Sequence, residues 1–407
     1  MIMSSAKAVT IVGAGPVGLL AALGLAKSGI AVNVLERAKG VISSPRAIAY
    51  HWSCLEGLSE LGLLEEALQV GFSKQDYCYI EYLTGDRIEY SLDVLEGRTK
   101  FPYNLHLGQH LLAEIALRKL AAYPNAAVHW GVNVTDITQD AEGVSVQAVG
   151  PSGELEFRSG WLVGADGAGS TVRSKLGLEF EGITWPKRFV AANLYLDFSK
   201  YGFARSTFLI DSTFGAIIVK LDRNDLWRCT YSEDVNLPEE SIPERMREFL
   251  GVIVPDAKDY KLDAYSPYRM HQRAATKFRV GRVLLAGDAA HATNPSGGYG
   301  LVGGLFDVYA LYKALAAVVQ GRAGDELLDR YAEDRRRVFL EIVSPAASEN
   351  KRMIFDTSDP AQRAADMAKI RHLAADKATL LERLMLTSRM SSEPLALSAM
   401  LPQSETI

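Results

Sequence analysis

The chain has 407 residues, 48% of them hydrophobic and 23% charged, and a formal net charge of −5. This length and composition are typical of a globular chain that buries one large core or two interleaved ones. The slightly acidic balance argues against nucleic-acid binding, which requires a basic face. Cys54, Cys78 and Cys229 stand far apart without a CxxC pair, so we expect reduced, buried thiols of a cytoplasmic protein and no metal site.

The first pattern along the chain is a glycine-rich phosphate-binding motif. A β-branched run over 9–12 is followed by GAGPVG and an apolar helix. In G-x-G-x-x-G the first glycine permits a tight turn, the second lets the backbone approach a pyrophosphate, and the third lets helix and strand pack closely. The helix N-terminus adds unpaired N–H groups and a positive dipole. We therefore predict dinucleotide contacts from Gly13, Ala14, Gly15, Pro16, Val17 and Gly18.

A second strand, IAVNVLER, ends at Glu36, where a carboxylate can accept hydrogen bonds from ribose hydroxyls. Strand, helix, strand and terminal acid in register make this a strong indication of a βαβ unit. The segment 9–26 carries no charge, but its glycines and Pro16 interrupt it, which favours the βαβ unit over a membrane span. The motif does not separate NAD from FAD.

The segment 77–92, YCYIEYLTGDRIEYSL, is predicted to be a β-hairpin facing the substrate region. Tyr77, Tyr79 and Tyr82 are its candidate substrate contacts, of which we assign Tyr82. From 180 to about 272 the chain alternates with the period of strands, with turns at 211–213 and 222–225. We predict an antiparallel sheet that covers the cofactor. Lys220, on the face shared by Ala216 and Ile218, is a candidate partner for a substrate carboxylate.

Two further strands end in glycine and aspartate. GWLVGADGAGSTVRSKLG places Asp166 after one strand, and LLAGDAAHATNPSGGYG places Asp288 after another, before Pro295 and a glycine loop. A nicotinamide dehydrogenase does not need these elements, whereas FAD is longer and does. Asp288 can bind ribitol hydroxyls, and the helix after Gly300 can stabilise negative charge on a reduced flavin.

The order and spacing of GAGPVG, VGADGAGSTVR and LLAGDAAHATNP resemble those of the single-component FAD-dependent aromatic monooxygenases, the family of para-hydroxybenzoate hydroxylase and phenol hydroxylase. The resemblance covers roughly residues 6–345. It implies an α/β fold in which a doubly wound FAD domain (1–179 and 276–345) is interleaved with an antiparallel β-sheet substrate domain (180–275). A C-terminal helical region (346–407) follows.

The resemblance also extends the cofactor contacts beyond the first motif. It assigns an arginine reaching the pyrophosphate, a backbone contact to adenine, the ribitol-binding aspartate and the loop over the flavin ring. The implied residues are Glu36, Arg37, Arg46, Gln109, Val134, Asp166, Asp288, Pro295, Gly298, Gly300, Leu301 and Val302. Val302 departs from the asparagine common in the family. Asp166 and Arg173 either serve the cofactor or only make structural hydrogen bonds, and we expect His291 to shape the ring loop.

The implied reaction uses NADH or NADPH to reduce FAD, and O2 then forms a flavin C4a-hydroperoxide that hydroxylates a phenol or hydroxypyridine. Ionising a substrate hydroxyl calls for a base, and His51, five residues after Arg46, is our candidate, with a packed histidine as the alternative. Pro295 joins Tyr82 and Lys220 as an expected substrate contact.

Other functions of the same fold remain open at this point. An FAD-dependent oxidase or reductase would not place oxygen in the product, and a non-catalytic flavin sensor would not turn over. A flavin-dependent halogenase is disfavoured because the sequence has no W-x-W. The substrate, the choice between NADH and NADPH, and assembly as a homodimer are not decided by the sequence, and we expect no membrane association.

Overall fold

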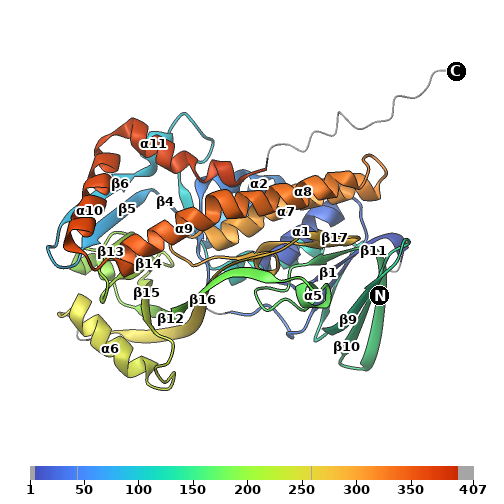
Figure 1. Cartoon of the computed structure of the whole chain (residues 1–407), viewed down its shortest axis with the longest axis horizontal. Coiled ribbons are helices and arrows are strands. Elements are labelled where there is room, and N and C mark those ends of the chain that lie inside the picture. The colour runs from blue at the N-terminus through green and yellow to red at the C-terminus, as the bar shows by residue number, and fades with distance from the viewer. Residues whose placement is uncertain (1–4, 44, 258, 393–407) are drawn as a thin grey trace.

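The computed structural model describes residues 5–43, 45–257 and 259–392. The predicted C-terminal region runs beyond residue 392, so its end lies outside the described residues. Within the described part of the chain, two eight-stranded sheets and a three-stranded sheet are covered by helices (Figure 1). The fold is α/β, with one sheet that has a parallel core and a separate, mostly antiparallel sheet.

The first large sheet has the strand order β17-β18-β11-β1-β2-β8, and β10 and β9 extend it from β11. β1 pairs in parallel with β2 and β11, and β11 pairs in parallel with β18, so the carboxyl ends of these strands lie at one edge. The strands are β1 (Ser5–Val12), β2 (Val32–Glu36), β8 (Ala126–Trp130), β9 (Asn133–Gln139), β10 (Val144–Gly150), β11 (Gly153–Gly164), β17 (Arg279–Val280) and β18 (Val283–Leu285). Since the three predicted glycine-containing loops follow β1, β11 and β18, the topology brings them together.

Helix α1 packs against α4 and α7, and α7 packs against α8. These helices are α1 (Pro16–Lys27), α4 (Gln109–Leu120), α7 (Tyr299–Val319) and α8 (Glu326–Val338). Among the described residues, α7 is the one helix long and apolar enough to cross a membrane, but 67% of that window is buried inside the protein. Its apolarity is therefore accounted for by packing in the core.

The second large sheet has the order β19-β16-β12-β15-β14-β13-β5-β6. The hairpin β5–β6 joins it through a parallel pairing of β5 with β13. The strands are β5 (Asp76–Glu81), β6 (Arg87–Ser91), β12 (Phe180–Tyr195), β13 (Ser206–Ile210), β14 (Ala216–Lys220), β15 (Leu226–Asp234), β16 (Lys261–Ala275) and β19 (His291–Ala292). The three-stranded sheet consists of β3 (Ala49–Tyr50), β4 (Phe72–Lys74) and β7 (Asn104–His106), and short helices α2 (Leu55–Leu61), α3 (Leu64–Val70) and α5 (Thr171–Lys175) fill the connections.

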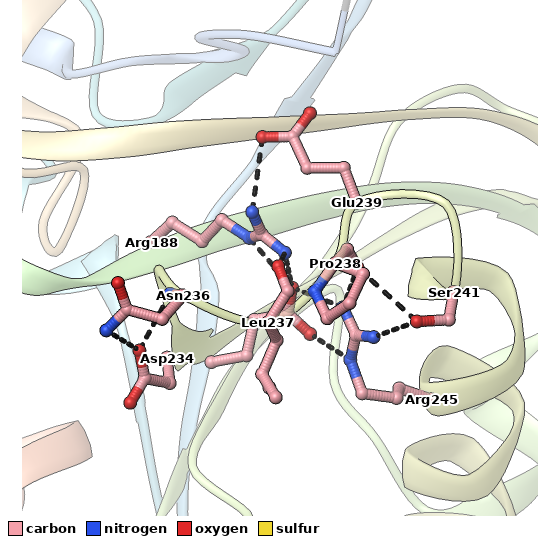
Figure 2. Close-up of polar contacts among 9 residues, drawn as sticks. Arg188, Asp234, Asn236, Leu237, Pro238, Glu239, Ser241 and Arg245 are labelled. Atoms are coloured by element: carbon pink, nitrogen blue, oxygen red, sulfur yellow. Dashed lines mark hydrogen bonds and ion pairs between the residues drawn. The ribbon is translucent and has the colours of Figure 1, made fainter.

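Helix α6 (Ile242–Ile253), which the sequence analysis did not predict, packs its apolar side on the second sheet. Ion pairs and hydrogen bonds of two arginines hold the loop before α6 in place (Figure 2). Glu233 on β15 accepts hydrogen bonds from Nε of buried Arg188 on β12 and from Nε of Arg245 on α6, each at 2.8 Å. Arg188 also donates to the carbonyl of Leu237 at 2.8 Å. This network holds α6 against the sheet, away from the first sheet (Figure 1).

The C-terminal helices lie beside the hairpin β5–β6 (Figure 1). They are α9 (Ser344–Lys351), α10 (Pro360–Ala375) and α11 (Lys377–Met385), with π-helical turns at Phe339–Val343 and Arg352–Asp356. Met367 and Ile370 on α10 pack against Ile88 and Ile210 of the second sheet. Helix α10 thus packs on the second sheet.

Candidate active site

One cavity of about 960 Å³ runs from the carboxyl edge of the first sheet to the inner face of the second. Loops after β1, β2, β11 and β18 line one end, and residues of β5, β6, β13, β14, β15 and β16 line the other. Helices α9, α10 and α11 close the substrate side. The volume is at the upper end of the range for ligand sites, as a bound dinucleotide next to a substrate requires.

The first glycine motif has the geometry expected for a pyrophosphate site. Gly13 has a φ of +105°, and a Cβ there would lie 2.3 Å from the carbonyl oxygen of Ala165. A Cβ at Gly18 would lie 1.9 Å from the carbonyl oxygen of Gly13. A Cβ at Gly15, by contrast, would meet no protein atom within 4 Å, so the cavity is open beside it. Gly18 does not line the cavity, and its role is close packing of α1 on the loop.

Glu36 lies at the end of β2 and lines the cavity. Its Oε2 accepts a hydrogen bond from the backbone N–H of Ala14 at 2.8 Å, and its Oε1 accepts one from Ala38 at 2.8 Å. Both oxygens are thereby fixed, and each retains a lone pair for a ligand hydroxyl. Other residues predicted to contact the cofactor also line this end of the cavity: Arg37, Arg46, Gln109 and Val134.

Asp166 and Arg173 have different positions. Asp166 lines the cavity and caps α5, accepting a hydrogen bond from Thr171 N at 2.7 Å. Burial raises the pKa of its carboxyl, although hydrogen bonds from Ser170 and the α5 backbone oppose this. Arg173 is buried, donates to the carbonyl of Ala289 at 2.9 Å and lies over the ring of Phe180. Since Arg173 does not line the cavity, its contacts are structural.

The loop after β18 leaves Asp288 exposed, and this residue lines the cavity. Desolvation raises the pKa of this carboxyl, against the opposing effect of His291. The loop is anchored by Asp307 on α7, which is fully buried and accepts a hydrogen bond from the backbone N–H of Gly287 at 2.8 Å. Asp307 therefore fixes the residue next to Asp288.

Asp307 is held in turn by two cationic or ionisable partners. Its Oδ2 accepts a hydrogen bond from His291 Nε2 at 2.8 Å, and its Oδ1 accepts one from Arg335 Nε at 2.8 Å. Burial alone would raise the pKa of Asp307, but His291 and Arg335 outweigh burial and lower it to about 2. His291 does not line the cavity and stacks between Phe278 and Phe339. His291 therefore lies on the side of the loop that faces the hydrophobic core.

The glycine loop before α7 forms the middle of the cavity. Pro295, Gly298, Gly300 and Leu301 all line it, whereas Val302 is fully buried in the core and does not. The side chain of Val302 packs in the hydrophobic core, so a cofactor contact through its backbone N–H stays a prediction. The N-terminus of α7 at Tyr299 opens on the cavity, as stabilisation of a negative ring edge requires.

His51 lies where the glycine loop meets the substrate side. Its Nε2 donates to the carbonyl of Gly297 at 2.8 Å, and its ring stacks on Tyr299 with centroids 5.5 Å apart. Burial lowers the pKa of His51 to about 4, although the Gly297 hydrogen bond opposes this. The imidazole is therefore neutral at pH 7, and with its proton on Nε2 it presents Nδ1 as an acceptor.

A stack of four aromatic rings forms the substrate-side wall. Tyr77 and Tyr79 on β5, Tyr90 on β6 and Phe208 on β13 all line the cavity. The ring centroids of Tyr79 and Phe208 are 4.8 Å apart, and those of Tyr77 and Tyr90 are 5.2 Å apart. Burial raises the pKa of all three tyrosines, that of Tyr79 to about 12, so they are neutral phenols at pH 7. This wall can stack on an aromatic ring.

Two predicted substrate contacts lie elsewhere. Tyr82 follows β5 and packs on Phe214, with ring centroids 5.2 Å apart. Lys220 lies on the strand face that points away from the cavity, whereas its neighbours Ile217 and Val219 line the cavity. We correct both assignments: successive strand residues point to opposite faces, and the sequence analysis chose the wrong face of β14.

Three further residues line the cavity and were not predicted from the sequence: Arg383 on α11, Asn350 on α9 and Arg228 on β15. Arg383 and Asn350 come from the C-terminal part of the chain, which had been predicted only as a helical region. Nothing in the sequence distinguishes Arg383 from the exposed charges of the same helix. Arg228, two residues from the cavity-lining Thr230, could have been found by strand alternation.

The chain is similar to known proteins along most of its length. The model of the FAD binding domain family matches residues 6–346. The chain is 44% identical over 354 residues to 6-hydroxy-3-succinoylpyridine 3-monooxygenase HspB of Pseudomonas putida (strain DSM 28022 / S16), covering 87% of this chain and 90% of that one. It is 42% identical over 389 residues to para-nitrophenol 4-monooxygenase of Pseudomonas sp. (strain WBC-3), covering 94% and 96%.

Among solved structures, p-nitrophenol 4-monooxygenase PnpA from Pseudomonas putida DLL-E4 matches with a TM-score of 0.93 and 41% identity, over 96% of this chain and 100% of that chain. Fold and site therefore define a flavoprotein of the FAD binding domain class. More narrowly, the chain belongs to the FAD-dependent aromatic monooxygenases, enzymes that use NAD(P)H and O2. The open cradle at Gly15, the fixed carboxylate of Glu36 and Asp288 fit FAD.

Proposed function

We propose that this enzyme hydroxylates a phenol or hydroxypyridine ring that stacks on the aromatic wall beside the glycine loop. The observation that carries the proposal is that the dinucleotide cradle, Asp288 and the four aromatic rings line one continuous cavity. Two relatives at 44% and 42% identity are named for a hydroxypyridine and a nitrophenol substrate, which supports this class of ring.

Bound FAD, reduced by NAD(P)H, would supply an activated oxygen atom for transfer to the ring. The protein must hold the ring, exclude water and accept the proton of the substrate hydroxyl. Tyr79 and Phe208 provide the stacking surface, and the C-terminal helices close the cavity on the far side. His51 remains our candidate for the hydroxyl contact, with Nδ1 as the accepting atom and Gly297 fixing the tautomer.

The test uses purified holoenzyme with para-nitrophenol and with 6-hydroxy-3-succinoylpyridine under 18O2. We expect one of them to stimulate consumption of NADH or NADPH and to give a product containing one labelled oxygen. The comparison of the two nucleotides identifies the reductant. Stimulated NAD(P)H oxidation that yields only hydrogen peroxide would instead support the oxidase alternative, and flavin binding without turnover on any ring would support the sensor alternative.

A cytoplasmic location and the absence of membrane association are further proposals that rest on the sequence. A homodimer is an assembly that the sequence leaves open. Size-exclusion chromatography with light scattering of the holoenzyme would check the dimer. Fractionation of cells that express the protein would check its location.

A further inference from the structure

Arg383 extends from α11 into the wall of the cavity. Its Nη2 donates a hydrogen bond to Oδ1 of Asn350 on α9 at 3.0 Å. The guanidinium of Arg383 interacts electrostatically with three tyrosines: Tyr299 at the start of α7, and Tyr79 and Tyr90 of the aromatic wall. The guanidinium is therefore between the glycine loop and the surface on which a substrate ring would stack.

No carboxylate balances this charge in the described part of the chain. Four carboxylates line the cavity, at Glu36, Asp166, Asp288 and Glu349. The first three belong to the dinucleotide end. Glu349, the neighbour of Asn350, accepts hydrogen bonds from Arg352 at both oxygens, at 2.8 and 2.7 Å. No ion pair shorter than 4.0 Å links Arg383 to any acid among the residues that the structure describes.

The neighbouring tyrosines do not supply the missing negative charge either. Burial raises the pKa of Tyr79 to about 12 and that of Tyr90 well above its usual value, so both are neutral at physiological pH. An arginine does not lose its proton in proteins. A partly buried guanidinium with only neutral hydrogen-bond partners is unfavourable until an anion binds to it. The cavity therefore favours a ligand that brings a negative charge to this point.

We propose that Arg383 binds an oxyanion of the aromatic substrate, so that the enzyme selects the anionic form of a phenolic, hydroxypyridine or carboxylate-bearing ring. This inference rests on the proposed function and specifies its substrate class. The planar fork of a guanidinium can donate two parallel hydrogen bonds to the two oxygens of a carboxylate, or a charge-assisted hydrogen bond to the single oxygen of a phenolate, which gives direction as well as charge. The negative charge can come from the ring oxygen itself or from a carboxylate substituent of the ring. The experiment below distinguishes these two sources.

The experiment measures binding to the oxidised holoenzyme through the change in flavin absorbance, without turnover. Two ligand pairs are used: 4-nitrophenol against 4-nitroanisole, and 3-benzoylpropionate against its methyl ester. Each pair has nearly the same shape and differs in charge. We expect wild-type protein to prefer the anionic member of at least one pair by about tenfold or more, the effect of one charge-assisted hydrogen bond. Preference in the first pair identifies the ring oxygen, and preference in the second identifies a carboxylate.

Arg383→Gln is shorter but keeps an N–H donor and removes the charge, and it should abolish the preference while leaving binding of the neutral members unchanged. Arg383→Lys, which keeps the charge but loses the fork, should retain part of the preference. Arg389→Gln, at an exposed position of the same C-terminal segment, is the matched control and should behave as wild type. FAD content and the circular dichroism spectrum verify folding of each variant.

If wild-type protein shows no preference in either pair, or if Arg383→Gln retains it, the inference is wrong. If Arg383→Gln fails to fold, the wild-type comparison and Arg383→Lys still decide. The proposed function fails separately, by the absence of labelled product with every ring tested, because the binding measurement requires no oxygen transfer. A charge preference without turnover would thus retain the anion site and reject the hydroxylase.

Discussion

Arg335 on α8 donates through Nε to Oδ1 of Asp307 on α7 at 2.8 Å, and both side chains are fully buried. The same arginine donates through Nη1 to the carbonyl of Met390 at 2.7 Å, and the same aspartate fixes Gly287 beside Asp288. One ion pair thereby connects the cofactor loop, the long core helix and the C-terminal segment.

Replacing Asp307 with Asn should destabilise the protein by about 3–5 kcal/mol, because Arg335 is then left buried without an anion. FAD affinity should fall as well, since the loop carrying Asp288 loses its anchor. Urea unfolding and FAD titration measure the two effects. Asp329→Asn, which removes an exposed partner of Arg279, is the control and should cost less than about 1 kcal/mol. Equal stability of the two variants would refute this account.

Gly18→Ala should abolish stable FAD binding. A Cβ at this position would lie 1.9 Å from the backbone oxygen of Gly13, so the phosphate loop must shift. Gly251→Ala is the matched control within another helix, because a Cβ there meets nothing within 4 Å. It should raise stability by about 0.5–1 kcal/mol through helix propensity. The flavin absorbance of the purified variants and their thermal midpoints report the results, and a yellow Gly18→Ala protein would contradict the packing argument.

His51→Ala should lower kcat by about 100-fold with a smaller change in KM, if Nδ1 contacts the substrate hydroxyl. His51→Gln keeps a donor for the Gly297 carbonyl and should recover part of the loss. The control is His372→Gln on the exposed side of α10. The packed-histidine alternative predicts the opposite pattern, in which His51→Ala lowers the thermal midpoint and leaves kcat unchanged.

Stability should decline as the pH falls from 6.5 toward 4. Burial lowers the pKa of His51 to about 4 and that of His106 to about 3, from an ordinary value of 6.5. The unfolded chain then binds more protons than the native chain below pH 6.5, so the stabilisation is complete above that pH and is lost on acidification. Each histidine contributes a slope of up to about 1.4 kcal/mol per pH unit.

Urea midpoints measured across this pH range check the effect, and His106→Gln should flatten the profile because one titrating group is gone. Asp307 adds a further loss only below pH 3.8, the ordinary value from which its pKa is lowered to about 2. A flat profile between pH 6.5 and 4 would show that the two histidines can be protonated without cost in the native state.

The cofactor side of the site was predictable because its signals are local. Each of the predicted residues lies at the end of a strand or just after it: the glycines that follow residue 12, Glu36, Asp166 and Asp288. Parallel pairing brings these strand ends to one edge of the sheet. Gly13 and Gly18 are glycines because backbone atoms occupy the space of a side chain. Such requirements can be read without knowing the rest of the fold.

The substrate side was not predictable to the same degree. Tyr77 and Tyr79 were candidates alongside Tyr82, but only the strand register decides which of them faces the cavity. Lys220 failed for the same reason. Arg383 reaches the site through the packing of α10 and α11 on the second sheet, a tertiary contact that leaves no local pattern in the sequence.

The cavity is assembled from both ends of the chain: β1 supplies its first phosphate loop, and α11 supplies part of its substrate wall. During translation the loops that line the dinucleotide end of the cavity are therefore synthesised before α11, which lines the other end. Folding can begin on the growing chain, but the wall of the cavity is complete only after translation has passed residue 387. A product ended by premature termination after α8 would keep the cradle loops and lack the C-terminal residues that line the cavity beside the second sheet.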